Sequence, residues 1–253
     1  MPMNPVYQEL PAHKALHRYV ECFWSSSIPH GTPSTTHRIL PDGCIDFIFD
    51  VSPNRSPQAR LVGTMTRPLL YRAGGDTDFV AVRFRPGGAT PFVGVPAHEI
   101  TDMETDLCSV WNGVLSLDRL SNTLRARDRI QLLESALLRQ LSAVDAVDSR
   151  ISSATAALQD PRASVDGLAH QLDLTRQHLS RLFRRHVGVT PKKFQRVIRM
   201  QKLTEQVRKL RLMPDWAQFA QHFGYSDQAH LVNECRTLTG VTPTEFFAEQ
   251  SRS

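Results

Sequence analysis

The hydrophobic positions of this chain follow two different patterns, and the change falls near residue 112. Before it, apolar stretches are short, rich in β-branched and aromatic residues, and interrupted by Pro and Gly. Cys44–Phe49 and Phe79–Phe84 have the length and composition of strands. Pro41-Asp42-Gly43 precedes the first run and Pro86-Gly87-Gly88 follows the second, as turns do. We therefore expect a β-rich N-terminal domain over residues 1–112.

From Leu115 onward the Pro and Gly interruptions cease and apolar residues recur at helical spacing. The pattern predicts a helix over residues 127–143, within a helical linker that we place at residues 113–147. Its apolar stripe has two readings, packing on the β-rich domain or forming a subunit interface, and the pattern leaves both open. The stripe consists of Ile130, Leu133, Leu137, Leu138 and Leu141.

The helical part contains an internal repeat. Residues 168–175 align with 219–226 at an offset of 51, and residues 178–194 align with 230–246 at an offset of 52. Each copy predicts a short helix, a turn, a second helix and then Gly-Val-Thr-Pro, whose Thr suits an N-cap and whose Pro suits a first helical position. Two such copies indicate two helix-turn-helix units, which are DNA-reading structures.

The chain is therefore predicted to have an α+β fold, with the β-rich domain and the linker followed by an all-α domain. A spacer helix of some 22 residues, about 33 Å long at 1.5 Å per residue, joins the two units. One turn of B-DNA is about 34 Å, so the spacer suits two successive major grooves. The predicted bounds are 148–253 for the domain, 164–186 and 215–238 for the units, and 191–212 for the spacer.

Charge changes along the chain in the same direction. Residues 1–145 have a net charge of −1 and residues 146–253 a net charge of +6. Within the second part, residues 162–211 carry +10 and residues 212–253 carry −3. A basic concentration of this kind favours a nucleic-acid partner, although a basic helix can also be only a solvated face.

Five runs within residues 148–250 form one pattern. They are Leu168-Ala-x-x-Leu172, Thr175-x-x-x-Leu179-x-Arg181-x-Phe183-Arg184, Gly188-Val-Thr-Pro191, Gly224-Tyr225-Ser226-Asp227 and Gly240-Val-Thr-Pro243. In these runs the chain resembles the AraC/XylS family of bacterial transcription regulators. The resemblance implies a sequence-specific, DNA-binding regulator in the cytoplasm, with double-stranded DNA as its partner and RNA polymerase as a further candidate.

The family motif and the helical register nominate DNA contacts in the first unit. Arg181 can place both donors on guanine O6 and N7, and Gln177 can do the same on adenine N6 and N7. The motif adds Ser180 as a third candidate for base contact. Three further arginines suit phosphate contacts, which position a domain without reading sequence. They are Arg176, Arg184 and Arg185.

The second unit departs from the family pattern at two positions. Asn233 stands where the first unit has Arg181, and Cys235 where it has Phe183. The shorter thiol of Cys235 predicts a looser helix, and the net charge of −3 predicts weaker DNA binding from this unit. The candidates for base contact here are Gln228, His230 and Asn233, and the candidate for phosphate contact is Arg236.

The N-terminal part has three motif-like runs, residues 37–50, Val62-Gly63-x-x-Thr66-Arg67-Pro68 and Arg83-Phe84-Arg85-Pro86-Gly87-Gly88. In these runs it resembles a small β-rich sensory domain found in a poorly characterised subset of the same family. The resemblance implies a cupin-like barrel that binds a small-molecule effector or mediates dimerisation. Arg67, Arg83 and Arg85 either hold an anionic effector or pair with Asp42, Asp46 and Asp50; the second reading is the simpler one.

Other classes of protein find less support in the sequence. The histidines lack ligand spacing, so we expect no metal and no cofactor. The four cysteines are unclustered, which speaks against disulfides and against a zinc-held cysteine that accepts alkyl groups from DNA. No membrane span and no catalytic motif is expected. A regulator without a small-molecule ligand and a sequence-blind architectural DNA-binding protein remain the alternatives.

Overall fold

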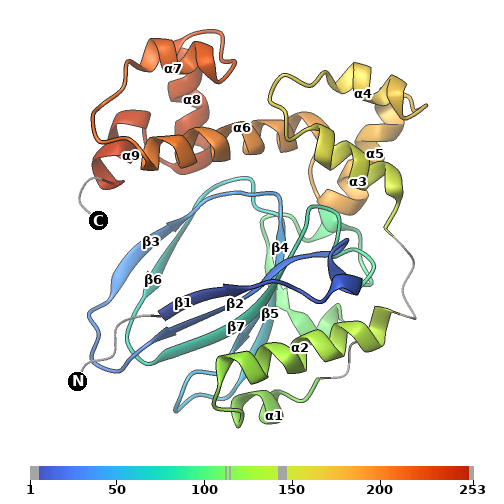
Figure 1. Ribbon diagram of the computed structural model, residues 1–253, viewed down its shortest axis with the longest axis vertical. Coiled ribbons are helices and arrows are strands. Elements are labelled where there is room, and N and C mark those ends of the chain that lie inside the picture. Colours follow the sequence, from blue (N-terminus) through green and yellow to red (C-terminus); the bar gives the residue numbers. More distant parts are fainter. Residues whose placement is uncertain (1–5, 112, 114, 142–146, 251–253) are drawn as a thin grey trace.

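The computed structural model describes residues 6–111, 113, 115–141 and 147–250. Figure 1 shows a β-rich domain on one side and an all-helical domain, built from residues 147–250, on the other, so the predicted α+β fold is confirmed. The strands are β1 (Val6–Leu10), β2 (Val20–Ile28), β3 (Thr35–Ile39), β4 (Ile45–Asp50), β5 (Gln58–Val62), β6 (Leu69–Ala73), β7 (Thr77–Phe84) and β8 (Glu104–Asp106). Short 3-10 turns lie at Lys14–Leu16, Ala97–Glu99 and Leu107–Ser109. The helices are α1 (Leu117–Ser121), α2 (Ala126–Leu141), α3 (Ser149–Ala157), α4 (Val165–Gln171), α5 (Arg176–Val187), α6 (Pro191–Arg208), α7 (Trp216–His222), α8 (Gln228–Thr239) and α9 (Pro243–Gln250).

The strands form two antiparallel sheets. Six of them pair in the order β1-β2-β7-β4-β5-β8, and β3 pairs with β6 in a separate two-stranded sheet. The two strands expected from sequence, β4 and β7, are neighbours in the larger sheet, with Ile45 opposite Phe84. Because side chains alternate along a strand, Ile45, Phe47 and Phe49 are buried on one face of β4.

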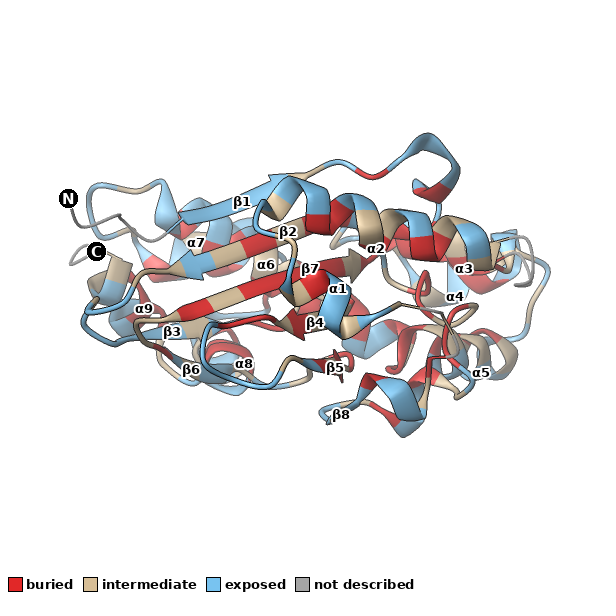
Figure 2. Cartoon of the chain, turned by 90° about the horizontal axis from the view of Figure 1, so that it is seen from below, coloured by how far each residue is buried: buried red, intermediate tan, exposed pale blue. Residues whose placement is uncertain are grey.

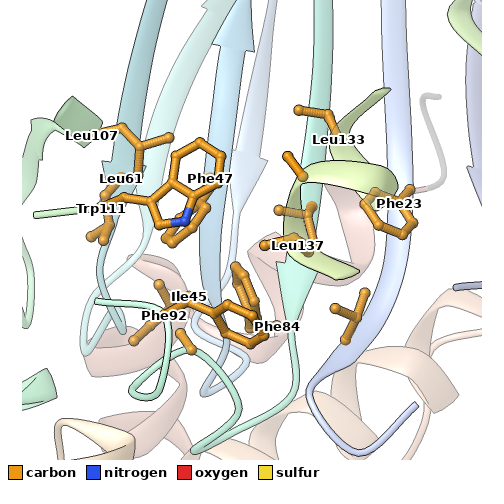
Figure 3. Close-up of a cluster of buried hydrophobic side chains, with 14 of the residues drawn as sticks. Phe23, Ile45, Phe47, Leu61, Phe84, Phe92, Leu107, Trp111, Leu133 and Leu137 are labelled. Atoms are coloured by element: carbon orange, nitrogen blue, oxygen red, sulfur yellow. The ribbon is translucent and has the colours of Figure 1, made fainter. Parts of the chain in front are cut away.

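Helix α2 covers that apolar face of the larger sheet. Figure 3 shows Leu133 and Leu137 of α2 among the aromatic side chains of the sheet, where the rings of Phe47 and Phe84 lie 4.7 Å apart. A buried Arg129 also ties α2 to the sheet, since it donates to Asp78 at 2.5 Å. The leucine stripe therefore packs within the chain, which is the first of the two readings. In Figure 2, α2 lies beside β2 and β7, and buried residues recur along the helix.

The C-terminal domain has two hydrophobic clusters, and α6 contributes to both. Phe194 and Ile198 belong to the cluster of the first helix-turn-helix unit, whereas Val197, Met200, Leu203 and Val207 belong to that of the second. Figure 1 shows the two units at opposite ends of α6. Because some apolar residues of α6 pack in the first cluster and others in the second, one continuous helix holds both units.

Candidate DNA-binding surface

The second helix of the first unit, α5, is defined at both ends by local interactions. Thr175 is its N-cap and accepts a hydrogen bond from the backbone N–H of His178 at 3.1 Å. Gly188 ends it in the left-handed conformation, at a φ of +92°. Leu179 and Phe183 are fully buried between these ends, which fixes the side that α5 turns to solvent.

The first unit's sequence candidates lie on that solvent side. Gln177, Arg181, Arg184 and Arg185 are exposed, and Ser180 is half-buried. Arg176 is also exposed and forms an open ion pair with Asp166 of α4 at 3.4 Å. Both members of this pair are well exposed, so the ion pair contributes little and Arg176 is accessible to a phosphate.

The second unit repeats this construction with different side chains. Asp227 caps α8 by accepting from the N–H of His230 at 2.7 Å, and this hydrogen bond holds the pKa of Asp227 below its usual value. Cys235 is fully buried in the place of Phe183 and contacts Thr239 within the second cluster. The candidate residues of this unit, Gln228, His230, Asn233 and Arg236, are all exposed.

His230 differs from the other candidates because its ring already has neighbours. Nδ1 lies 3.1 Å from the Ser226 hydroxyl, and the ring stands edge-on to Tyr225 with the centroids 5.3 Å apart. Its Nε2 edge is the part left for a DNA contact.

The spacer helix is shorter than its sequence pattern predicts. Helix α6 ends at Arg208 instead of Leu212, and its 18 residues correspond to about 27 Å instead of 33 Å. The prediction that the helix reaches Leu212 is therefore wrong. Leu212 is 83% exposed, so nothing holds it in a helical turn against the core, and Pro214 disfavours helical geometry at the residue before it.

Two basic side chains of α6 turn towards the second unit. Arg196 forms two hydrogen bonds with Glu234 of α8, at 2.6 and 2.7 Å. Arg199 donates to the Gly224 carbonyl at 3.0 Å and lies over the Tyr225 ring at 5.2 Å. Counting both arginines toward a DNA-facing charge of +10 therefore overstates that charge.

The N-terminal domain contacts the C-terminal ends of both second helices. At α5, three threonine hydroxyls donate to three consecutive carbonyls: Thr64 to Val187 (2.7 Å), Thr90 to His186 (3.0 Å) and Thr101 to Gly188 (2.9 Å). At α8, Arg38 of β3 donates to the Thr239 carbonyl at 2.7 Å and pairs with Glu249 of α9 at 2.8 Å. No local signal in the sequence pointed to these four side chains.

The three arginines proposed for an anionic effector share no interaction partner among the contacts of the described residues. Arg83 lies 3.3 Å from Asp46 and 3.7 Å from Asp42, in agreement with the simpler reading for this residue. Arg85 pairs instead with Glu21 at 2.6 Å. Arg67 is exposed on the loop between β5 and β6.

Cavities and metal groups add little to this surface. A small cavity of about 130 Å³ lies between the domains, where Thr66 faces residues of α6 and α8 that include Lys193 and Thr237. Within the described residues there is no group of three or more His, Cys, Asp or Glu side chains placed to hold a metal ion. The described helices also include none that is long and apolar enough to cross a membrane.

Comparison with known families agrees with this construction. Residues 168–249 match a family described as a helix-turn-helix domain, and residues 8–106 match a domain of unknown function. Residues 168–249 thus form a DNA-binding domain of the helix-turn-helix class, of the AraC type.

Several solved structures are similar to parts of the chain or to most of it. A transcriptional regulator with an AraC-type DNA-binding domain from Chromobacterium violaceum is 23% identical, over 41% of this chain and 89% of its own, with a TM-score of 0.35. ToxT from Vibrio cholerae O395 is 10% identical, over 91% of this chain and 99% of its own, with a TM-score of 0.45. The C-terminal domain of the response regulator yesN from Fusobacterium nucleatum is 18% identical, over 39% and 94%, with a TM-score of 0.34. No curated protein gives a significant match.

Proposed function

We propose that the protein reads specific DNA sequences by placing α5 and α8 in two successive major grooves. The observation that carries this proposal is the repeated construction of the two units. Each buries the apolar side of its second helix, exposes polar side chains in the same register, and is held to its partner by the continuous helix α6. The placement of the units at opposite ends of α6 suits two readers on one side of a duplex (Figure 1).

The exposed side chains divide into two groups by chemistry. Gln177, Arg181 and Gln228 carry paired donors or a donor and an acceptor that match base edges. Ser180, Asn233 and the free edge of His230 are further candidates for base contact. An exposed arginine side chain carries a positive charge that suits a phosphate. The proposed phosphate contacts are Arg176, Arg184, Arg185 and Arg236.

Selection of binding sites from random duplexes tests this proposal. We expect an enriched site with two separate conserved parts, about one helical turn apart, and a much higher affinity for it than for random duplex of equal length. Equal affinity for both duplexes would favour the alternative of a sequence-blind architectural protein. Mapping the bound promoters in cells would then identify the regulated genes.

We further propose that the N-terminal domain modulates this binding, through an effector, a second copy of the chain or RNA polymerase. The support is contact: side chains from four separate segments of the domain hydrogen-bond to the C-terminal ends of α5 and α8. Any ligand that shifts these segments acts on both readers.

Screening small anions and metabolites for a rise in the melting temperature of the full chain tests for a small-molecule effector. Sedimentation at tens of micromolar tests for a dimer.

A further inference from the structure

The three threonines that contact α5 come from separate places in the N-terminal domain. Thr64 follows β5, Thr90 lies after β7, and Thr101 follows the turn at Ala97–Glu99. The last carbonyls of any helix lack partners within the helix, so each hydroxyl satisfies one of them. Thr64 is almost fully buried, which makes its hydrogen bond the most costly of the three to lose.

The second unit is reached by one continuous segment. Arg38 contacts α8 and α9, Leu40 is buried within the hydrophobic cluster of the second unit, and Gln201 of α6 donates to the Pro41 carbonyl at 2.5 Å. Two residues further on, Gly43 lies against Phe194 in the cluster of the first unit. Residues 38–43 therefore follow α6 from one unit to the other.

From these contacts we infer that Arg38, Thr64, Thr90 and Thr101 are positioning residues for DNA reading. They hold α5 and α8 at their C-terminal ends in one relative orientation, while Gln177 and Arg181 of α5, and Gln228 of α8, stay exposed. We call these four the tethering residues. The docked N-terminal domain thus sets the geometry between the readers without covering them. This inference rests on the proposed reading of two grooves.

A fixed relative orientation of the two units affects the affinity with which they bind one duplex together. Once the first unit is bound, the second binds as an intramolecular event, and its effective concentration depends on how often it already has the correct orientation. Tethering restricts the orientations in the free protein, so less orientational freedom is lost on binding. The affinity for a site with both parts should therefore depend on the tethering residues, and the affinity for one part alone should not.

The first experiment measures binding of full-length variants to two duplexes, one with both parts of the selected site and one with the second part scrambled. We expect Arg38→Ala, and the combined Thr64→Val and Thr101→Val variant, to lose about tenfold on the complete site and less than twofold on the scrambled one. Arg72→Ala is the matched control, because it removes the same charge from the same two-stranded sheet while its hydrogen bond goes to Ser34. The threonine variant keeps charge and shape, so the test survives if Arg38→Ala unfolds.

The Glu249→Ala variant distinguishes a positioning role of the Arg38–Glu249 pair from the effect of the Glu249 charge on DNA binding. Removing an acidic group from the DNA-binding domain should tighten binding if only charge matters. If the Arg38–Glu249 pair positions α8, the same change should weaken binding to the complete site. Tighter binding in this variant would overturn the inference.

The second experiment measures geometry without DNA. Spin labels at Gln171→Cys in α4 and Gln218→Cys in α7, both exposed positions, report the distance between the units in a Cys108→Ser background. We expect a narrow distance distribution for the otherwise unaltered chain and a broader one after Arg38→Ala. If Arg38→Ala changes neither the distance distribution nor the ratio of the affinities for the complete and the scrambled site, the inference about the tethering residues is wrong. The proposed two-groove reading is not affected by that result. A chain that shows no preference for the complete site overturns the proposed two-groove reading instead.

Discussion

Arg181 and Arg184 lie three residues apart on the exposed side of α5, and the two roles proposed for them make different predictions. Arg181→Ala should cost about 1–3 kcal/mol on the selected site and relax the preference at one base position. Arg184→Ala should weaken binding to all sequences alike and lower the slope of log affinity against log salt by about one. Binding curves at two salt concentrations measure both effects. Loss of base preference in Arg184→Ala, with none in Arg181→Ala, would reverse the assignment.

Asp46 predicts a pH dependence of stability. Burial raises its pKa to about 6, although Arg83 and the indole N–H of Trp24 favour the charged form. Because the folded pKa lies above the unfolded one, the folded state binds the proton more tightly, and stability falls as pH rises between about 4 and 6. Asp46→Asn does not titrate. The free energy of unfolding of the wild type should therefore decline relative to Asp46→Asn by at most about 3 kcal/mol over this range.

Urea unfolding at pH 4 and pH 7 measures this difference, and the shared titrations of other groups cancel in it. A difference that is constant with pH would mean that Arg83 keeps the pKa of Asp46 near its ordinary value.

At the scale of residues, the features that the sequence predicts correctly are those with a local cause. The cap Thr190, within Gly-Val-Thr-Pro, follows from neighbouring positions in the chain, and the structure has it where the pattern places it. The tethering residues have no such signal, since Thr64 and its acceptor are 123 positions apart. The hydrogen bond from Arg196 to Glu234 has no local signal either, because Glu234 is on another helix.

At the scale of elements, α2 offers a test of where its leucine stripe acts. Leu133 is 2% exposed in the core of the β-rich domain. Leu133→Ala should lower the free energy of unfolding by about 2–5 kcal/mol, as a buried cavity does. Ser135→Ala, at an exposed position of the same helix, should change it little. We expect sedimentation to give the same oligomeric state for both variants; dissociation of a dimer in Leu133→Ala alone would place the stripe in a subunit interface.

Helix α8 is predicted to contribute less to binding than α5. Asn233→Ala should cost less than Arg181→Ala, because an amide has no charge and no rigid pair of donors. Asn233→Arg should tighten binding with little gain in specificity, since it adds a cation on the exposed side of α8. Titrations on the selected site compare the three variants. If Asn233→Ala costs more than Arg181→Ala, the second unit is the main reader.

The elements predicted from sequence were those with a strong repeat or a clear boundary. Strands β4 and β7 and the paired helices of both units have such signals. The partners of β4 and β7 in the sheet do not, because β2 and β5 are set by pairing across the sheet rather than by their own composition. The predicted end of α6 at Leu212 is wrong because an apolar Leu212 fits the sequence pattern, yet 83% of its surface remains exposed.

At the scale of the whole molecule, the interface between the domains bears on whether the DNA-binding domain folds by itself. A fragment of residues 148–253 keeps both clusters of apolar residues except Leu40. We expect it to fold, with helical circular dichroism, and to melt at a lower temperature than the same domain in the full chain, because the surface that Leu40 covers becomes exposed. A fragment without helical signal would show that the boundary at residue 148 is wrong.

Leu40 and Gly43 also limit how regulators of this construction can be recombined. Leu40 completes the apolar interior of a domain that begins more than a hundred residues later. Gly43 has a φ of +82°, and a Cβ there would lie 2.6 Å from the Phe194 ring. A chimera that exchanges one DNA-binding domain for another at the linker would keep this segment but change the surface it fits. Exchangeable specificity in such chimeras therefore requires a matched graft of residues 38–43, and homologous domain shuffling should favour pairs that carry both surfaces together.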